Sequence, residues 1–136
     1  MSITKYDTIT DPKYLDWSEY PITFSRANQW VDIPYLGCFP LVLDPTIRNV
    51  RFKKVLIDGG SALNILFARS LTKLGLTKDD LVHVDSTFWG IVPGRASQPL
   101  GQITFLVQFG TANHLCTEYI NFFVVDFATT YHAILC

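Results

Sequence analysis

Apolar and polar residues alternate over much of the chain in a pattern that predicts mainly β-structure. In the segment "GQITFLVQFG" (101–110), Ile103, Phe105, Val107 and Phe109 fall on one face of a strand. The runs "CFPLVLDP" (38–45) and "NVRFKKVLID" (49–58) predict two strands of a hairpin. "YINFFVVD" (119–126) and "YHAIL" (131–135) predict two more strands.

One segment has the spacing of a helix. In "ALNILFARSLTKLGL" (62–76), apolar residues recur at positions 63, 66, 67, 71 and 74, and Gly75 supplies the usual left-handed end. Thr77 and Asp80 have the spacing of a cap for a one-turn helix over residues 78–82. The pattern therefore predicts a mainly β fold with one principal helix, either a small barrel or a sandwich.

The first part of the chain lacks a clear period. Residues 1–36 scatter aromatic residues among prolines, which predicts an irregular arm over residues 1–21 and one short strand near residues 22–24. With 136 residues in all, the chain is long enough for one domain, which we place at residues 22–136.

Composition narrows the classes of function. Apolar residues make up 49% of the chain, so it should fold, and a net charge of -1 gives no electrostatic reason to expect nucleic acid as a partner. No apolar run approaches the roughly 18 residues of a membrane span and no leader opens the chain, so we expect no membrane partner and a soluble, cytoplasmic protein. Cys38, Cys116 and Cys136 lack metal-ligand spacing, and we expect two buried small side chains and one terminal thiol.

The stretch "KVLIDGGSALNILF" (54–67) places an ionisable Asp58 within an apolar run. A buried lone carboxylate costs several kcal/mol unless it is paired or solvated, so this residue calls for a use. A serine-hydrolase elbow fails because Leu63 stands where its second glycine belongs, and a phosphate-binding loop fails because no G-x-x-x-x-G-K is present. The three histidines (His83, His114 and His132) lie in separate segments with no ligand spacing.

A pair of carboxylates is the remaining chemistry. Two facing carboxyl groups share a proton, so that one activates water while the other protonates a scissile carbonyl. "LIDGG" supplies an acid at a strand end followed by glycine, but only one acid, and a second copy of the chain related by a twofold axis would bring the other. The alternative, a strand-ending Asp58 in a tight Asp-Gly turn, stays open at this point.

A family resemblance adds to this interpretation. "VLIDGGSALNILF", "LTKLGL", "FWGIVPGRASQPLGQITFLVQFG" and "INFFVVDFATTYHAILC" follow one another in an order that resembles the retropepsin-like aspartic protease domain of plant gypsy-class LTR retrotransposon polyproteins. The resemblance runs from about Ile22 to the last residue. It implies a small closed β-barrel subunit, active as a homodimer, that needs no metal or cofactor.

The same resemblance implies the site residues. Asp58 would be the catalytic carboxylate of each subunit, within an active-site turn that includes Gly59, Gly60 and Ser61. "FWGIVPG" (88–94) would be the flap that closes over an extended peptide or polyprotein substrate. Its predicted substrate-binding residues are Phe88, Trp89, Gly90 and Ile91.

Two positions depart from the family pattern. Gly59 stands where most aspartic proteases have a serine or threonine that braces the two active-site loops. Cys136 replaces a glycine, where a Cβ is expected to clash with the catalytic turn, and the chain stops where the family continues, which suggests a C-terminally truncated domain. The alternative function is therefore an inactive remnant that acts as a dimerising or peptide-binding module.

Overall fold

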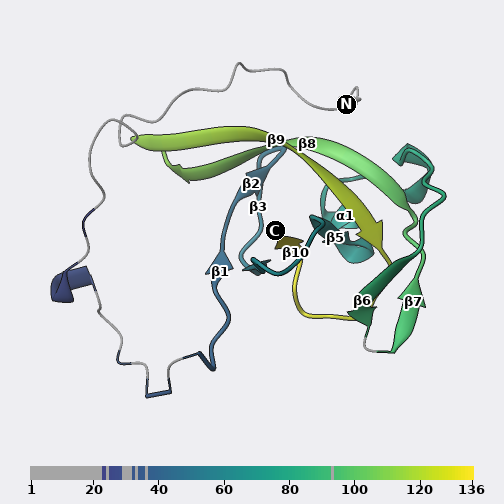
Figure 1. Ribbon diagram of the computed structural model, residues 1–136. Coiled ribbons are helices and arrows are strands. Elements are labelled where there is room, and N and C mark those ends of the chain that lie inside the picture. The colour runs from purple at the N-terminus through teal and green to yellow at the C-terminus, as the bar shows by residue number, and fades with distance from the viewer. Residues whose placement is uncertain (1–22, 24, 29–31, 33, 36, 93) are drawn as a thin grey trace.

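The described part of the chain folds around a curled β-sheet with one short helix. The computed structural model describes residues 23, 25–28, 32, 34, 35, 37–92 and 94–136 (Figure 1). The predicted arm at 1–21 lies outside these residues, as do both ends of the short strand predicted near 22–24. The helical segments are η2 (Arg26–Asn28), α1 (Ala68–Lys73) and η3 (Lys78–Asp80).

Within the described residues, eight strands form one sheet in the order β1-β4-β10-β5-β9-β8-β2-β3, and two more form a separate hairpin, β6-β7. The expected mainly β architecture with one principal helix is confirmed. The strands are β1 (Val42–Leu43), β2 (Thr46–Ile47), β3 (Val50–Arg51), β4 (Val55–Ile57), β5 (Ile65–Phe67), β6 (Phe88–Val92), β7 (Arg95–Ser97), β8 (Gly101–Thr111), β9 (His114–Val125) and β10 (Ala133–Leu135).

The longest pair, β8 and β9, forms an antiparallel hairpin that arches over the other strands (Figure 1). Its register runs from Gly101 opposite Val124 to Thr111 opposite His114. The predicted inward face is confirmed along the strand, since Ile103, Phe105 and Val107 are fully buried and Phe109 packs against the core at its margin. This hairpin is the longest paired element of the eight-stranded sheet.

The predicted hairpin over residues 38–58 is present in a more divided form. β1 pairs antiparallel with β4, and the connection between them makes its own small hairpin, in which β2 pairs with β3. The turn of the small hairpin holds Arg48 and Asn49 at φ 47° and 67°. β2 also pairs with β8. The segment from β1 to β3 therefore supplies the strands at both edges of the sheet, which brings these two edges toward each other.

The predicted helix over residues 62–76 is wrong in its first half. Residues 65–67 form strand β5, which pairs parallel with β9 and antiparallel with β10, and the helix covers only Ala68–Lys73. Ile65 and Phe67 pack with Val125 on one side of the sheet, whereas Leu66 enters the main core on the other. Because both faces of β5 are buried, its continuous apolar run cannot be told from a helix by spacing.

Two predicted helix ends are confirmed. Gly75 has φ +70°, and the Leu76 N–H donates to Leu71 O at 3.0 Å, which closes α1 in the manner of a left-handed C-terminal motif. Thr77 and Asp80 form a capping box on η3, where the Thr77 N–H donates to Asp80 Oδ2 at 2.9 Å.

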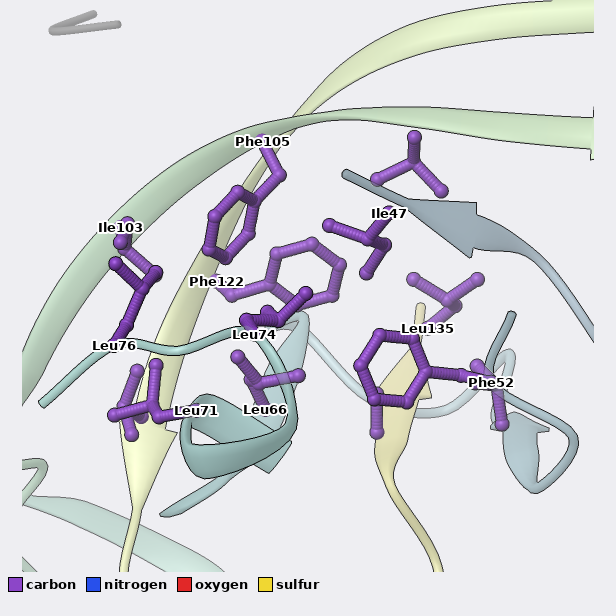
Figure 2. Close-up of a cluster of buried hydrophobic side chains, with 14 residues drawn as sticks. Ile47, Phe52, Leu66, Leu71, Leu74, Leu76, Ile103, Phe105, Phe122 and Leu135 are labelled. Carbon is purple, nitrogen blue, oxygen red and sulfur yellow. The ribbon is translucent and has the colours of Figure 1, made fainter. Parts of the chain in front are cut away.

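The main core lies between α1 and the concave side of the curled sheet. Figure 2 shows Phe105 and Phe122 of the long hairpin, Leu71 from the helix, and Phe52 and Leu135 from the far side. The cluster thus draws on segments from position 47 to position 135, so that long-range packing holds the short strands together.

The expected burial of two cysteines is wrong. Cys38 and Cys136 are exposed, and Cys116 is only half-buried. Cys38 precedes β1, and Cys116 lies in the half of β9 that extends beyond the main core. Among the described residues, no helix is long and apolar enough to cross a membrane.

Candidate active site

Asp58 follows strand β4 directly and begins a tight turn. Its backbone N–H donates to Leu135 O at 2.8 Å, which ties the turn to the end of β10. Within the turn, the Gly60 N–H donates to Asp58 Oδ1 at 3.0 Å and the Ser61 N–H donates to Asp58 O at 3.1 Å. These bonds fix both the backbone and one carboxylate oxygen of Asp58.

The interpretation of Asp58 as a buried core carboxylate is wrong for the single chain. The residue is exposed, because β4 ends at Ile57 and the chain turns away from the core there. A solvated carboxylate avoids the desolvation cost that its position in the sequence suggested. Asp58 therefore has one oxygen held by the turn and a surface open to other molecules.

The residues after Asp58 shape the turn in different ways. A Cβ at Gly59 would meet nothing within 4 Å, whereas a Cβ at Gly60 would lie 3.4 Å from Asp58 Oδ1. The Ser61 hydroxyl donates to Leu63 O at 2.8 Å and accepts from the Leu63 N–H at 3.3 Å. Ser61 thus stabilises its own loop, while Gly59 leaves space beside the carboxylate.

The predicted flap is a hairpin of strands β6 and β7. Phe88 pairs with Ser97 and Trp89 with Ala96, and Gly90 has φ +94°, a conformation that favours glycine. Ile91 belongs to β6 by its backbone, but its side chain lies outside the described residues. The hairpin segment is therefore confirmed as two paired strands.

Neighbouring aromatic residues of β6 have different surroundings. The Phe88 ring meets Phe123 of β9 edge to face, with centroids 4.9 Å apart and planes at 75°. Trp89 is 74% exposed. Phe88 thus fastens the hairpin to the scaffold, and Trp89 is the aromatic residue free to contact another molecule.

One cleft brings the turn and the hairpin together. Its volume is about 480 Å³, and it holds Asp58, Gly60 and Ser61 along with Phe88, Trp89 and Gly90. Among the described side chains, Gly59 is not part of this lining. The lining residues that sequence analysis missed are Ala62, Leu63, Ile65, Thr87 and Ile134.

The missed residues carry little signal of their own. Ala62 and Leu63 directly follow the predicted turn, so their proximity was available from the sequence. Ile65 was assigned to a helix, and Ile134 reaches the cleft only because β10 lies between β4 and β5. Both placements depend on pairing between distant segments.

The expected clash at Cys136 is absent. The Cys136 N–H donates to Asn64 Oδ1 at 3.0 Å and its Sγ lies 3.2 Å from the same oxygen, with the residue exposed. Asn64 also accepts a bond from the Phe123 N–H through its backbone carbonyl, at 2.9 Å. Asn64 therefore links the loop after the turn to both β9 and the end of β10.

Among the described residues that line the cleft, Asp58 is the acidic one. Across the described residues, no group of three or more His, Cys, Asp or Glu side chains could hold a metal ion. His83 and His114 are exposed, and His132 is buried near helix α1, away from the cleft lining. The arrangement suits acid–base chemistry only if another carboxylate joins Asp58.

Comparison with solved structures identifies the fold. No protein-family model matches the chain, and no curated protein matches it in sequence. Among solved structures, the chain is similar to the retroviral protease-like domain of Ddi1 from Leishmania major, with 21% sequence identity and a TM-score of 0.50. The similarity covers 71% of this chain and 69% of that one, and it shows that the chain has a retropepsin-like fold.

Proposed function

We propose that this chain is a retropepsin-type aspartic endopeptidase that acts as a homodimer, with Asp58 of each subunit as the catalytic carboxylate. The observation that supports it most is the shared cleft, in which the Asp58 turn lies opposite Trp89 and Gly90 of the β6-β7 hairpin. A cleft with one acid in each subunit calls for a twofold partner, because the chemistry needs two.

The reaction follows from two facing carboxyl groups that hold one proton between them. The ionised Asp58 takes a proton from water as the water oxygen attacks the peptide carbonyl carbon. The protonated Asp58 of the other subunit gives its proton to the carbonyl oxygen. The tetrahedral intermediate then collapses: the carboxyl group that took the proton from water gives it to the leaving nitrogen, and the C–N bond breaks. The other carboxylate takes back a proton from the hydroxyl as the new carboxylic acid forms.

The turn prepares Asp58 for this role. The Gly60 N–H holds Oδ1 at 3.0 Å, and the bond from the Asp58 N–H to Leu135 O fixes the backbone, so the carboxylate is oriented before substrate arrives. The open position beside Gly59 leaves room for the matching turn of a second subunit.

The substrate would be an extended peptide lying between the turn and the hairpin. Ala62, Leu63 and Ile65 on one side and Trp89 on the other make the lining largely apolar, which favours apolar side chains next to the cleaved bond. In the setting that the sequence resemblance implies, a plant gypsy-class retrotransposon, that peptide would be a segment of the polyprotein.

The test is cleavage of a peptide library, read by mass spectrometry, with wild type and Asp58→Asn compared across acidic and neutral pH. We expect Asp58→Asn to lose cleavage by about 10²–10⁴-fold or more, because an amide neither accepts nor delivers the proton. Asp126→Asn is the matched control, since Asp126 is also an exposed acid directly after a strand. Equal cleavage by wild type and Asp58→Asn would refute the proposal.

Mixing the two proteins tests the division of the site between subunits. When equal amounts of wild type and Asp58→Asn exchange subunits, about one quarter of random dimers keep both acids. Activity per wild-type chain should therefore fall to about half of its value without the variant. Unchanged activity after subunit exchange would show that one chain carries the whole site.

Gly59 favours a second candidate, a module that dimerises or binds peptides without cleaving them. The turn lacks the hydroxyl that most aspartic proteases have at this position. Peptide binding without cleavage, in wild type and Asp58→Asn alike, would support this alternative over the enzyme.

A further inference from the structure

His132 is a buried histidine whose side chain the proposed reaction does not use. It is 6% exposed, and its ring meets Phe52 edge to face with centroids 5.2 Å apart. Nε2 lies 3.0 Å from Lys73 Nζ, and Nδ1 is buried with no hydrogen-bond partner among the residues that the structure describes. Because an ammonium group only donates, Nε2 must be the acceptor, so the bond requires a neutral imidazole with its proton on Nδ1.

The charged groups that act on this imidazole are all positive. Lys73 and Arg69 belong to helix α1, and Lys54 directly precedes β4. Burial first, and then these three cations, lower the pKa of His132 from its usual 6.5. A second positive charge at this position would be both desolvated and repelled.

The backbone of His132 ties together the strands on either side of β10. Its N–H donates to Lys54 O at 2.8 Å, and its carbonyl accepts from the Phe67 N–H at 3.1 Å and from the Ser70 hydroxyl at 2.8 Å. Helix α1 adds a further contact, because Arg69 donates to Thr130 O at 2.7 Å. His132 thus fixes the start of β10 between β4, β5 and the helix.

The other end of β10 holds the Asp58 turn. β10 runs parallel to β4, with Ala133 opposite Val55 and Leu135 opposite Ile57, and Leu135 O accepts the Asp58 N–H at 2.8 Å. The three residues of β10 (Ala133–Leu135) therefore connect His132 to the carbonyl group that accepts the Asp58 N–H. Displacement at the His132 end acts on that anchor directly.

We propose that His132 is a positioning residue, which holds β10 beneath the Asp58 turn while neutral and releases both when it is protonated. The consequence for catalysis rests on the proposed function, whereas the release of β10 does not. The proton that converts Nε2 from acceptor to donor breaks the bond to Lys73 and leaves two cations in contact. We expect β10, which His132 holds in place, to separate from its neighbours as a result.

The direction of the pH dependence follows from the lowered pKa. Above the unfolded pKa of about 6.5, both folded and unfolded chains hold a neutral His132 and the fold has its full stability. As the pH falls below that value, the unfolded state takes up the proton first, and folding is disfavoured until the folded pKa is reached. Each unit between the two pKa values raises the unfolding or opening constant about tenfold.

Two measurements on the intact chain test the proposal. The first is NMR titration of the imidazoles, in which the pKa of His132 should lie below its usual value of 6.5. The second is amide hydrogen exchange, in which the protection factors of Asp58 and Phe67 should fall as the pH is lowered from 7 to 5, by up to about tenfold for each unit that the folded pKa of His132 lies below 6.5. The amide of Phe105, in the long hairpin, serves as the internal reference.

Variants separate the titration from simple loss of packing. His132→Leu removes the ionisable group, so the protection of Asp58 should no longer depend on this pH range, whatever its absolute level. Lys73→Met removes an exposed cation and should raise the pKa of His132 and reduce the pH dependence. His83→Leu, which removes an exposed imidazole, is the matched control and should behave as wild type.

The outcomes are distinct. Unchanged protection at Asp58 while His132 titrates would overturn the proposal, as would an equal loss at Phe105, which reports global unfolding. If the chain cleaves peptides, kcat/KM of His132→Leu should begin to fall at a lower pH than that of wild type. An unchanged pH dependence of kcat/KM would count against the role of His132 in positioning Asp58. An inactive chain that shows the Asp58 exchange effect would refute the enzyme and support the release of β10.

Discussion

The chain contains two consecutive antiparallel hairpins that follow the same local rules and have different surroundings. The β8-β9 hairpin pairs with β2 along one edge and β5 along the other, and the middle of its inner face is buried in the main core. The β6-β7 hairpin forms a two-stranded sheet of its own, whose contact with the scaffold includes the Phe88–Phe123 ring pair.

The two hairpins differ in what they contribute: β8-β9 to the stability of the fold and β6-β7 to the cleft. A two-stranded hairpin alone is marginal in water, so β6-β7 depends on what it packs against. The long hairpin supplies that support and also carries the core. We expect substitutions in β8 or β9 to change the free energy of unfolding, and substitutions on the cleft side of β6 to change binding instead.

Phe105→Ala gives the largest expected effect on stability. Phe105 is completely buried and belongs to the main core, so its truncation leaves a cavity and should lower the free energy of unfolding by about 3–5 kcal/mol. Urea denaturation followed by far-UV circular dichroism measures it. Phe39→Ala is the control, because Phe39 is 59% exposed and its loss should cost less than about 0.5 kcal/mol. Equal effects would contradict this division of the molecule.

The long hairpin was predictable because large apolar residues recur at every second position of β8, in alternation with residues that include Gln102, Thr104 and Gln108. Ile103, Phe105 and Val107 repeat with the period of a strand, and the structure buries all three. Strand β5 was not predictable in the same way. Ile65, Leu66 and Phe67 are all buried, and what makes them a strand is pairing with β9 and β10, which lie far along the chain.

The candidate site also has features that follow from local sequence and features that depend on long-range strand pairing. The Asp58 turn and the β6 segment carry local signals, an acid with two glycines and an aromatic run with glycines, and the structure brings them to one cleft. The exposure of Asp58 and the contribution of Ile134 depend on how β10 inserts beside β4. Local pattern could identify the residues, but long-range pairing determines their surroundings.

Phe88→Ala tests the attachment of the cleft hairpin, with an intermediate effect. Loss of the edge-to-face contact with Phe123 should cost about 0.5–1.5 kcal/mol beyond the lost apolar area, and hydrogen-exchange protection in β6 and β7 should fall more than in β8. Trp89→Ala, at the adjacent and 74% exposed position, should change stability by less than about 0.5 kcal/mol and weaken peptide binding. A larger loss of stability for Trp89→Ala than for Phe88→Ala would reverse the roles assigned to the two rings.

Gly59→Ser should have the smallest effect on the single chain and sharpens the role of the turn. A Cβ at this position meets nothing within 4 Å, so the free energy of unfolding of the monomer should change by less than about 0.5 kcal/mol. In a dimer built around two facing turns, the new hydroxyl can donate a hydrogen bond across the interface, worth roughly two- to tenfold in the dimer Kd. Sedimentation over a concentration series measures this Kd, and Gly59→Ala supplies the Cβ without the hydroxyl. If the serine and alanine variants dimerise equally, the turns do not meet through this position, and the open space at Gly59 has a different purpose.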